Sequence, residues 1–101
     1  MAKLSAHGEQ LIRLEREQTR QDEFITWSRD TVVLCSDDVV LRKRDVRFVP
    51  DQFHPAGRLH HHGWKRVGKL KRLPDTAQRF IEYYERLGYE CQFEHRREVR
   101  A

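Results

Sequence analysis

Apolar residues near the C-terminus recur at helical spacing, and this is the clearest pattern in the chain. The stripe consists of Ala77, Phe80, Ile81, Tyr84 and Leu87. Asp75 follows a proline just before the stripe and predicts an N-cap, with Gln78 completing a capping box. Gly88 tolerates a positive φ and predicts the C-terminal end. We therefore expect a helix over residues 76–87.

Three segments have the pattern of β-strands. Residues 24–35 and 39–49 are rich in β-branched and aromatic side chains. They flank Ser36-Asp37-Asp38, whose side chains favour turns, so the two segments predict a hairpin. Residues 89–95 alternate apolar and polar side chains, which predicts a strand directly after the helix.

The N-terminal segment fits two templates. Ile12 and Leu14 alternate with charged neighbours as in a strand, whereas Leu4, Leu11 and Leu14 would also share one side of a helix. We favour a strand over about residues 9–18.

The middle of the chain is interrupted by proline and glycine between Pro50 and Gly63. We expect a basic, His-rich loop over residues 51–63, which is long for a compact domain, and long loops often carry function. Residues 64–70 predict a short strand with a bulge or bend at Gly68. Residues 96–101 predict a polar tail.

A chain of 101 residues predicts one domain, spanning residues 1–101. The elements indicate an α+β fold, with an antiparallel sheet of four to five strands in the chain order β-β-β-β-α-β. The C-terminal helix packs on one face and a final strand follows. We expect the helix to contact a set of apolar strand residues: Phe24 or Ile25, Val33, Leu41, Val46, Phe48, Cys91 and Phe93.

Targeting signals are missing from the sequence pattern. No apolar run approaches the length of about 20 residues that crosses a bilayer, and the first residues have no signal-peptide core. We expect an intracellular, cytoplasmic protein with no membrane partner. In that setting Cys35 and Cys91 are expected to be reduced, buried thiols.

Charge is distributed very unevenly along the chain. Ten of the twenty Lys and Arg residues fall between Leu41 and Arg72, where the only acids are Asp45 and Asp51. A local excess of positive charge attracts polyanions, so this segment predicts an anionic partner.

Aromatic residues and histidines are interleaved with these cations, a mixture that suits phosphates and stacked bases. The predicted nucleic-acid-binding residues are Arg42, Arg44, Arg58, His60, His62, Trp64, Lys65, Arg66, Lys69 and Lys71. A purely structural interpretation has even weight, because lysines also protect sheet edges from aggregation.

The histidines raise two further alternatives. The first alternative is a site for zinc or another transition metal. Neighbouring residues in an extended chain point to opposite sides, so only His60 and His62 of the triplet share a side, and no zinc-binding spacing is present. Metal-free ribonuclease chemistry would use His60 or His62 with His95 and Arg58. Both alternatives are weaker than binding, and we assign no catalytic residue, metal or cofactor.

The sequence therefore predicts a non-enzymatic module that binds nucleic acid, DNA or RNA, or a nucleoprotein complex. The alternative is a protein–protein regulator or inhibitor that docks on a large assembly, for example through an added strand at a sheet edge.

Overall fold

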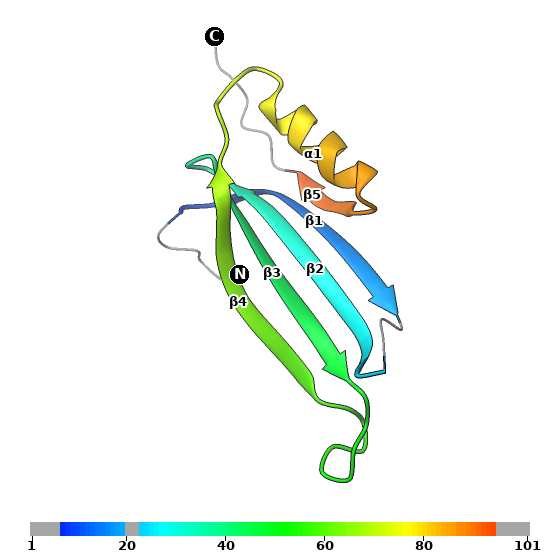
Figure 1. Cartoon of the computed structure of the whole chain (residues 1–101). Helices are drawn as coiled ribbons and strands as arrows, with labels where there is room; N and C mark the ends of the chain where they lie inside the picture. Colours follow the sequence, from blue (N-terminus) through cyan, green and yellow to red (C-terminus); the bar gives the residue numbers. More distant parts are fainter. Residues whose placement is uncertain (1–6, 20–22, 95–101) are drawn as a thin grey trace.

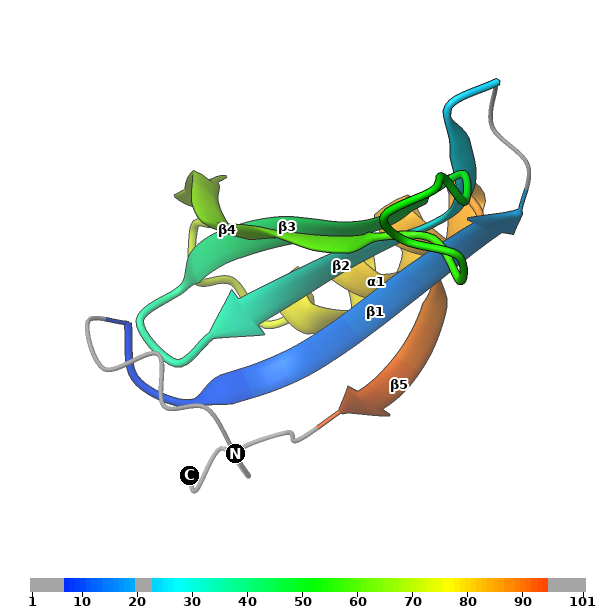
Figure 2. The same cartoon turned by 90° about the horizontal axis from the view of Figure 1, so that it is seen from below.

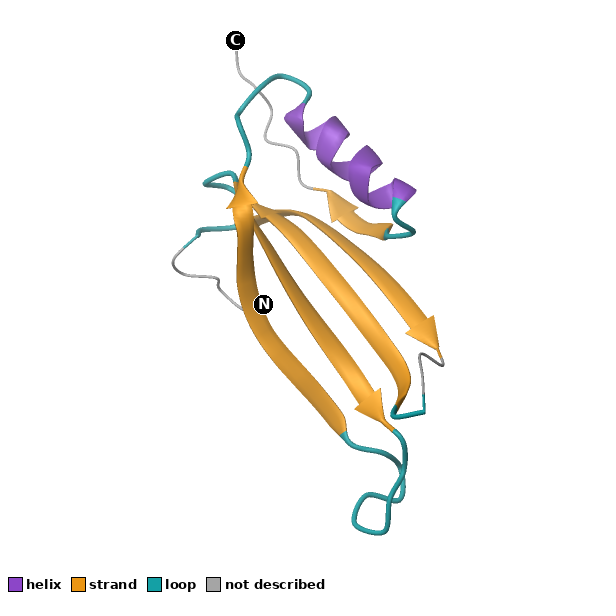
Figure 3. Cartoon of the chain, in the orientation of Figure 1, coloured by secondary structure: helices purple, strands orange, loops and turns teal. Residues whose placement is uncertain are grey.

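The computed structural model describes residues 7–19 and 23–94, which form a five-stranded antiparallel sheet and one helix (Figures 1 and 3). The elements in chain order are β1 (Gln10–Thr19), β2 (Ile25–Cys35), β3 (Val39–Phe48), β4 (Leu59–Lys69), α1 (Thr76–Arg86) and β5 (Glu90–Glu94). The strand order in the sheet is β4-β3-β2-β1-β5. The predicted α+β class, chain order and final strand are confirmed, and the N-terminal segment is a strand. The predicted polar tail lies outside the described residues.

The β2–β3 turn forms where the sequence predicts it. Asp38 has a φ of 70°, and its backbone N–H donates to the Cys35 carbonyl at 2.9 Å. The Asp37 carboxylate accepts from the Val39 N–H at 3.1 Å. Aspartate favours both arrangements because its short side chain bonds to the local backbone.

The helix begins differently from the prediction. Asp75 precedes α1 but makes no side-chain capping hydrogen bond, so the predicted capping box is wrong at this residue. Its carboxylate pairs instead with Arg79, one turn into the helix. Thr76 secures the entry: its hydroxyl accepts from the Leu73 N–H at 2.8 Å and donates to the Lys71 carbonyl at 2.7 Å.

The helix ends at the predicted glycine. Gly88 has a φ of 90° and its N–H donates to the Glu85 carbonyl at 3.0 Å. The Tyr89 N–H reaches back to the Tyr84 carbonyl at 3.1 Å. This pair of bonds is a Schellman motif, which turns the chain directly into β5.

Two apolar clusters occupy the two faces of the sheet, and α1 lies on one face only (Figure 2). On the helix-bearing face the buried residues are Ile12, Leu14, Val32, Leu34, Val40, Phe80, Ile81 and Tyr89. On the opposite face Val33, Cys35, Val39 and Leu41 pack together with Trp64. Most of the predicted helix contacts are therefore wrong.

The reason is that side chains alternate between the two faces along each strand, so a shift of one residue moves a side chain to the other face. Leu14 lies opposite Val32, which puts Val32 and not Val33 under the helix. Leu41 lies opposite Val33 and is therefore also on the face away from the helix. Phe24 and Phe93 are exposed side chains and Val46, although buried, is outside the helix cluster.

The central loop is shorter than predicted. It covers residues 49–58, and β4 begins at Leu59, so the histidine triplet lies in a strand and not in a loop. Gly57, with a φ of 84°, turns the chain, and the Phe48 N–H donates to the Arg58 carbonyl at 2.9 Å to close the hairpin.

The two cysteines are both free thiols but differ in burial. Cys35 is fully buried, and this burial, helped by the negative charge of Asp37, raises its pKa to about 11. Cys91 is exposed on β5, so the prediction of two buried thiols is wrong for this residue.

Candidate functional site

A groove lined mainly by cations lies on the helix-bearing face, on the part of the sheet that α1 leaves uncovered. We call it the basic groove. Its volume is about 440 Å³, and its lining residues are Arg16, Asp30, Arg42, Lys43, Arg44, His62, Gly63, Lys65 and Tyr89.

Strand register builds this groove. Arg16 on β1 lies opposite Asp30 on β2, Asp30 lies opposite Arg44 on β3, and Arg44 lies opposite His62 on β4. Side chains in register point to the same face of a sheet, so these four residues form one charged row across four strands.

Asp30 holds two arginines in this row. Its carboxylate accepts from Arg44 Nε at 2.8 Å and from Arg16 Nη2 at 3.0 Å. Burial alone would raise the pKa of Asp30, but the bonds and charges of the two arginines outweigh it and lower the pKa. The carboxylate is therefore ionised and fixes both guanidinium groups.

Arg16 also connects the groove to the end of the helix. Its Nη1 donates to the Leu87 carbonyl at 3.0 Å, and its Cζ lies 4.7 Å from the centre of the Tyr89 ring. The position of this guanidinium is thus fixed by a carboxylate, a carbonyl and an aromatic face together.

One row closer to the helix, Arg42 lies directly opposite Lys65. Neither side chain has an ion-pair partner among the residues that the structure describes, and both are exposed. Like charges placed opposite each other destabilise a sheet. The fold therefore gains no electrostatic stabilisation from this pair. An anion bound from outside would be attracted to both side chains.

The histidine triplet is divided between the two faces. His60 and His62 lie on the groove side with their ring centres 4.5 Å apart. His61 lies on the other side, with Nδ1 2.6 Å from the buried Asp45 carboxylate. In the described part of the chain, no group of three or more His, Cys, Asp or Glu side chains has a metal-binding arrangement.

The remaining sequence-predicted residues lie elsewhere. Trp64 packs on the opposite face beneath the Lys43 ammonium, 5.2 Å from the ring centre, and Arg66 lies opposite Leu41 on that same face. Arg58 lies over the Phe48 ring near the β3–β4 loop. Lys69 and Lys71 lie at the other end of β4, near the start of α1.

The structure thus gathers half of the ten predicted residues on one face, namely Arg42, Arg44, His60, His62 and Lys65. Sequence reasoning missed Arg16, Asp30 and Tyr89. One signal was available for Asp30: it stands two residues before Val32 in a strand whose apolar side chains face the core. An acid at such a position requires a cationic partner.

Comparisons of the chain with protein-family models, with curated proteins and with solved structures find no match. Over the described residues, no helix combines the length and the apolar character needed to span a membrane.

Proposed function

We propose that this protein binds nucleic acid through the basic groove. The observation that carries the proposal is the exposed pair Arg42 and Lys65, which stands beside the Arg44–His62 pair without a described ionic partner of its own. Clustered, exposed cations bind the phosphates of a nucleic-acid backbone by neutralising their charge and releasing counterions.

The spacing of the cations favours a chain of phosphates over a single small anion. Arg42 and Arg44 lie two residues apart on one face of β3, which separates their Cα atoms by about 7 Å. His62 and His60 extend the same surface along β4.

The opposite face provides a matched comparison for the test. Arg47 and Arg66 lie on β3 and β4, as Arg42 and Lys65 do, but on the other side of the sheet. Removing either pair subtracts two positive charges from the same two strands.

The experiment measures the affinity of a labelled single-stranded RNA by fluorescence anisotropy over a range of salt concentrations. Arg42→Gln with Lys65→Gln is expected to weaken binding on the order of tenfold and to reduce the log–log salt slope by about 1.4. Arg47→Gln with Arg66→Gln is expected to leave both nearly unchanged. Equal losses in the two double variants would mean that only net charge matters, and the basic groove would be rejected as the site.

One observation favours a second candidate function. β4 is an edge strand of 11 residues, and such an edge can accept an added strand from a protein partner. A protein that docks there would stay bound at high salt, whereas RNA in the basic groove would dissociate.

A further inference from the structure

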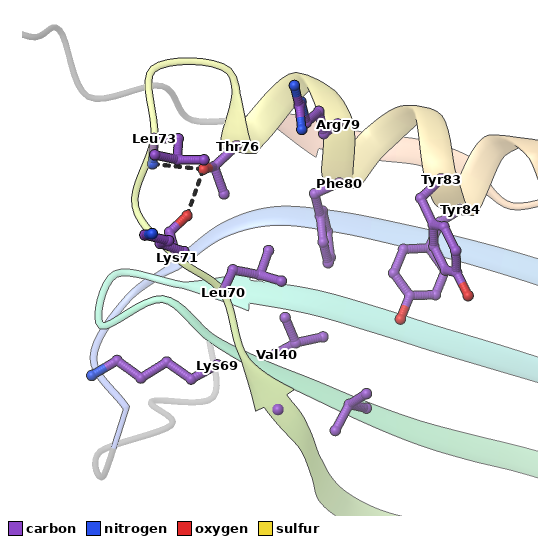
Figure 4. A pocket seen from close by; sticks show the side chains of 12 residues that line it. Val40, Lys69, Leu70, Lys71, Leu73, Thr76, Arg79, Phe80, Tyr83 and Tyr84 are labelled. Carbon is purple, nitrogen blue, oxygen red and sulfur yellow. Dashed lines mark hydrogen bonds between the residues drawn. The ribbon is translucent and has the colours of Figure 1, made fainter.

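A second cavity, separate from the basic groove, lies between α1 and the end of β4 (Figure 4). We call it the apolar pocket. Its volume is about 460 Å³, within the range of small-molecule sites. Its lining residues are Val40, Val67, Gly68, Lys69, Leu70, Lys71, Leu73, Thr76, Arg79, Phe80, Tyr83 and Tyr84.

The pocket is open because β4 has a glycine at its floor. Gly68 lies opposite Val40, whose side chain points toward the helix, and a Cβ atom built on Gly68 would meet no atom within 4 Å. Figure 4 shows Val40 and Leu70 pointing toward Phe80 from across this space. A side chain at residue 68 would therefore fill the pocket.

The walls favour a hydrocarbon ligand. At the rim, the side chains of Val67, Leu73 and Tyr83 are 53%, 46% and 58% exposed. Together they form an apolar surface, and a ligand that covers it removes this surface from water. The Thr76 hydroxyl is already engaged in two hydrogen bonds with the backbone of Leu73 and Lys71. A nucleobase would leave polar edges facing apolar walls, which is costly, whereas an alkyl chain would not.

The charges around the pocket are positive. Lys69, Lys71 and Arg79 are among its lining residues, and none of the described lining residues carries a carboxylate. Arg79 pairs with Asp75 at the start of the helix, and in Figure 4 Lys69 points away from the apolar walls. Of the three lining cations, Lys71 is therefore the one that remains as a partner for an anionic head group.

We propose that the apolar pocket binds a single-chain acyl carboxylate, with its alkyl tail between Leu70 and Phe80 and its carboxylate at the mouth near Lys71. This site does not depend on the basic groove, so either assignment can fail alone.

The first test is calorimetric titration with hexanoate, octanoate and decanoate below their micelle-forming concentrations. Affinity is expected to rise about fourfold per added methylene, because each methylene is transferred from water to apolar walls. The alcohol and the amine of the same length are expected to bind more weakly than the carboxylate. No binding, or binding without dependence on chain length, would overturn the proposal. Equal affinity for the alcohol would show that the mouth of the pocket does not recognise the carboxylate.

The second test uses the two glycines of β4 as a matched pair. A Cβ at either glycine meets no atom within 4 Å, but Gly68 lines the apolar pocket and Gly63 lines the basic groove. Gly68→Leu is expected to reduce octanoate affinity at least tenfold while RNA affinity is kept, and Gly63→Leu is expected to keep octanoate affinity. If Gly68→Leu is unfolded by circular dichroism, Gly68→Val takes its place.

The same titrations are repeated with vesicles of anionic phospholipid and with a nucleoside monophosphate, and three outcomes would count against the proposal. Unchanged octanoate binding to the folded residue-68 variant would place the ligand elsewhere. Tighter binding to vesicles of anionic phospholipid than to octanoate would assign the pocket to a membrane lipid. Stronger binding of a nucleoside monophosphate than of octanoate at this pocket would make it a nucleotide site.

Discussion

The helix-bearing face of the sheet has two halves that differ sharply in chemistry. Near α1, one row across the strands reads Ile12, Leu34, Val40 and Gly68. Two rows further along the same four strands, the row reads Arg16, Asp30, Arg44 and His62. The same strands thus change from core to charged surface within a few residues.

The length of the helix explains where the change falls. An 11-residue helix is about 16 Å long, whereas strands of 10 or 11 residues extend about 35 Å, so α1 covers less than half of the sheet. On the helix-bearing face, the apolar side chains near α1 stabilise the fold because the helix removes them from water. Beyond its end at Arg86, polar side chains occupy the same face.

The largest expected effect comes from the apolar half. Phe80 is 4% exposed and packs on the helix-side cluster. Phe80→Ala is expected to lower the free energy of unfolding by about 3–5 kcal/mol, measured by urea denaturation, because it removes a buried ring and leaves a cavity. Phe53→Ala, at a 78% exposed loop residue, is the control and should cost less than about 0.5 kcal/mol. Similar losses at both residues would mean that the helix does not cover a core.

A smaller effect is expected from the charged half. Asp30→Asn leaves Arg16 and Arg44 without their carboxylate and should destabilise the domain by about 2 kcal/mol. The loss is below that of a fully buried pair because the arginines are 30% and 48% exposed. Arg42→Gln, which breaks no described ion pair, is the control and should leave the free energy of unfolding nearly unchanged.

Acid provides an independent check on the same carboxylate. The folded state lowers the pKa of Asp30, so its contribution to stability is complete above the unfolded pKa near 3.9 and is lost as the pH falls through the lower folded value. The stability difference between the wild-type protein and Asp30→Asn should therefore shrink only below about pH 4. A difference that is constant down to pH 2 would show that ionisation of Asp30 is not its source.

The smallest changes in stability are expected from substitutions at two glycines. Gly88→Ala is expected to cost about 1 kcal/mol, because Gly88 has a φ of 90° and an added Cβ would meet only ordinary contact with Arg16. Gly68→Ala, in a strand with open space above it, is expected to stabilise by up to about 1 kcal/mol. Thermal denaturation measures both, and a gain at Gly88 would contradict the Schellman geometry.

Much of the fold could be predicted from local patterns. The stripe from Ala77 to Tyr84 and the stop at Gly88 identify α1, and the turn residues at Asp37 and Asp38 identify the β2–β3 hairpin, because these signals depend on neighbours in sequence. The face of each strand could not be predicted in the same way. Val32 and Val33 are both apolar, and only pairing with Leu14 on another strand decides which one faces the helix.

Less of the candidate site could be predicted. Sequence proximity suggested that Lys65 and Arg66 act together, whereas their alternation in β4 sends them to opposite faces. Arg16 and Asp30 lie on different strands and join Arg44 only through the sheet register. Composition identifies how many cations a segment has, but the pairing of strands decides which of them share a surface.

The position of β5 beside β1 has a consequence for biogenesis. Leu14 pairs with Cys91, so the strand nearest the beginning of the described chain is completed by the strand nearest its end. During translation, β1 emerges before the other elements of this sheet, and its outer hydrogen-bonding groups stay unpaired until α1 and β5 have followed. Such distant pairing slows folding. The nascent polypeptide therefore carries an unpaired edge on β1 until β5 has emerged from the ribosome.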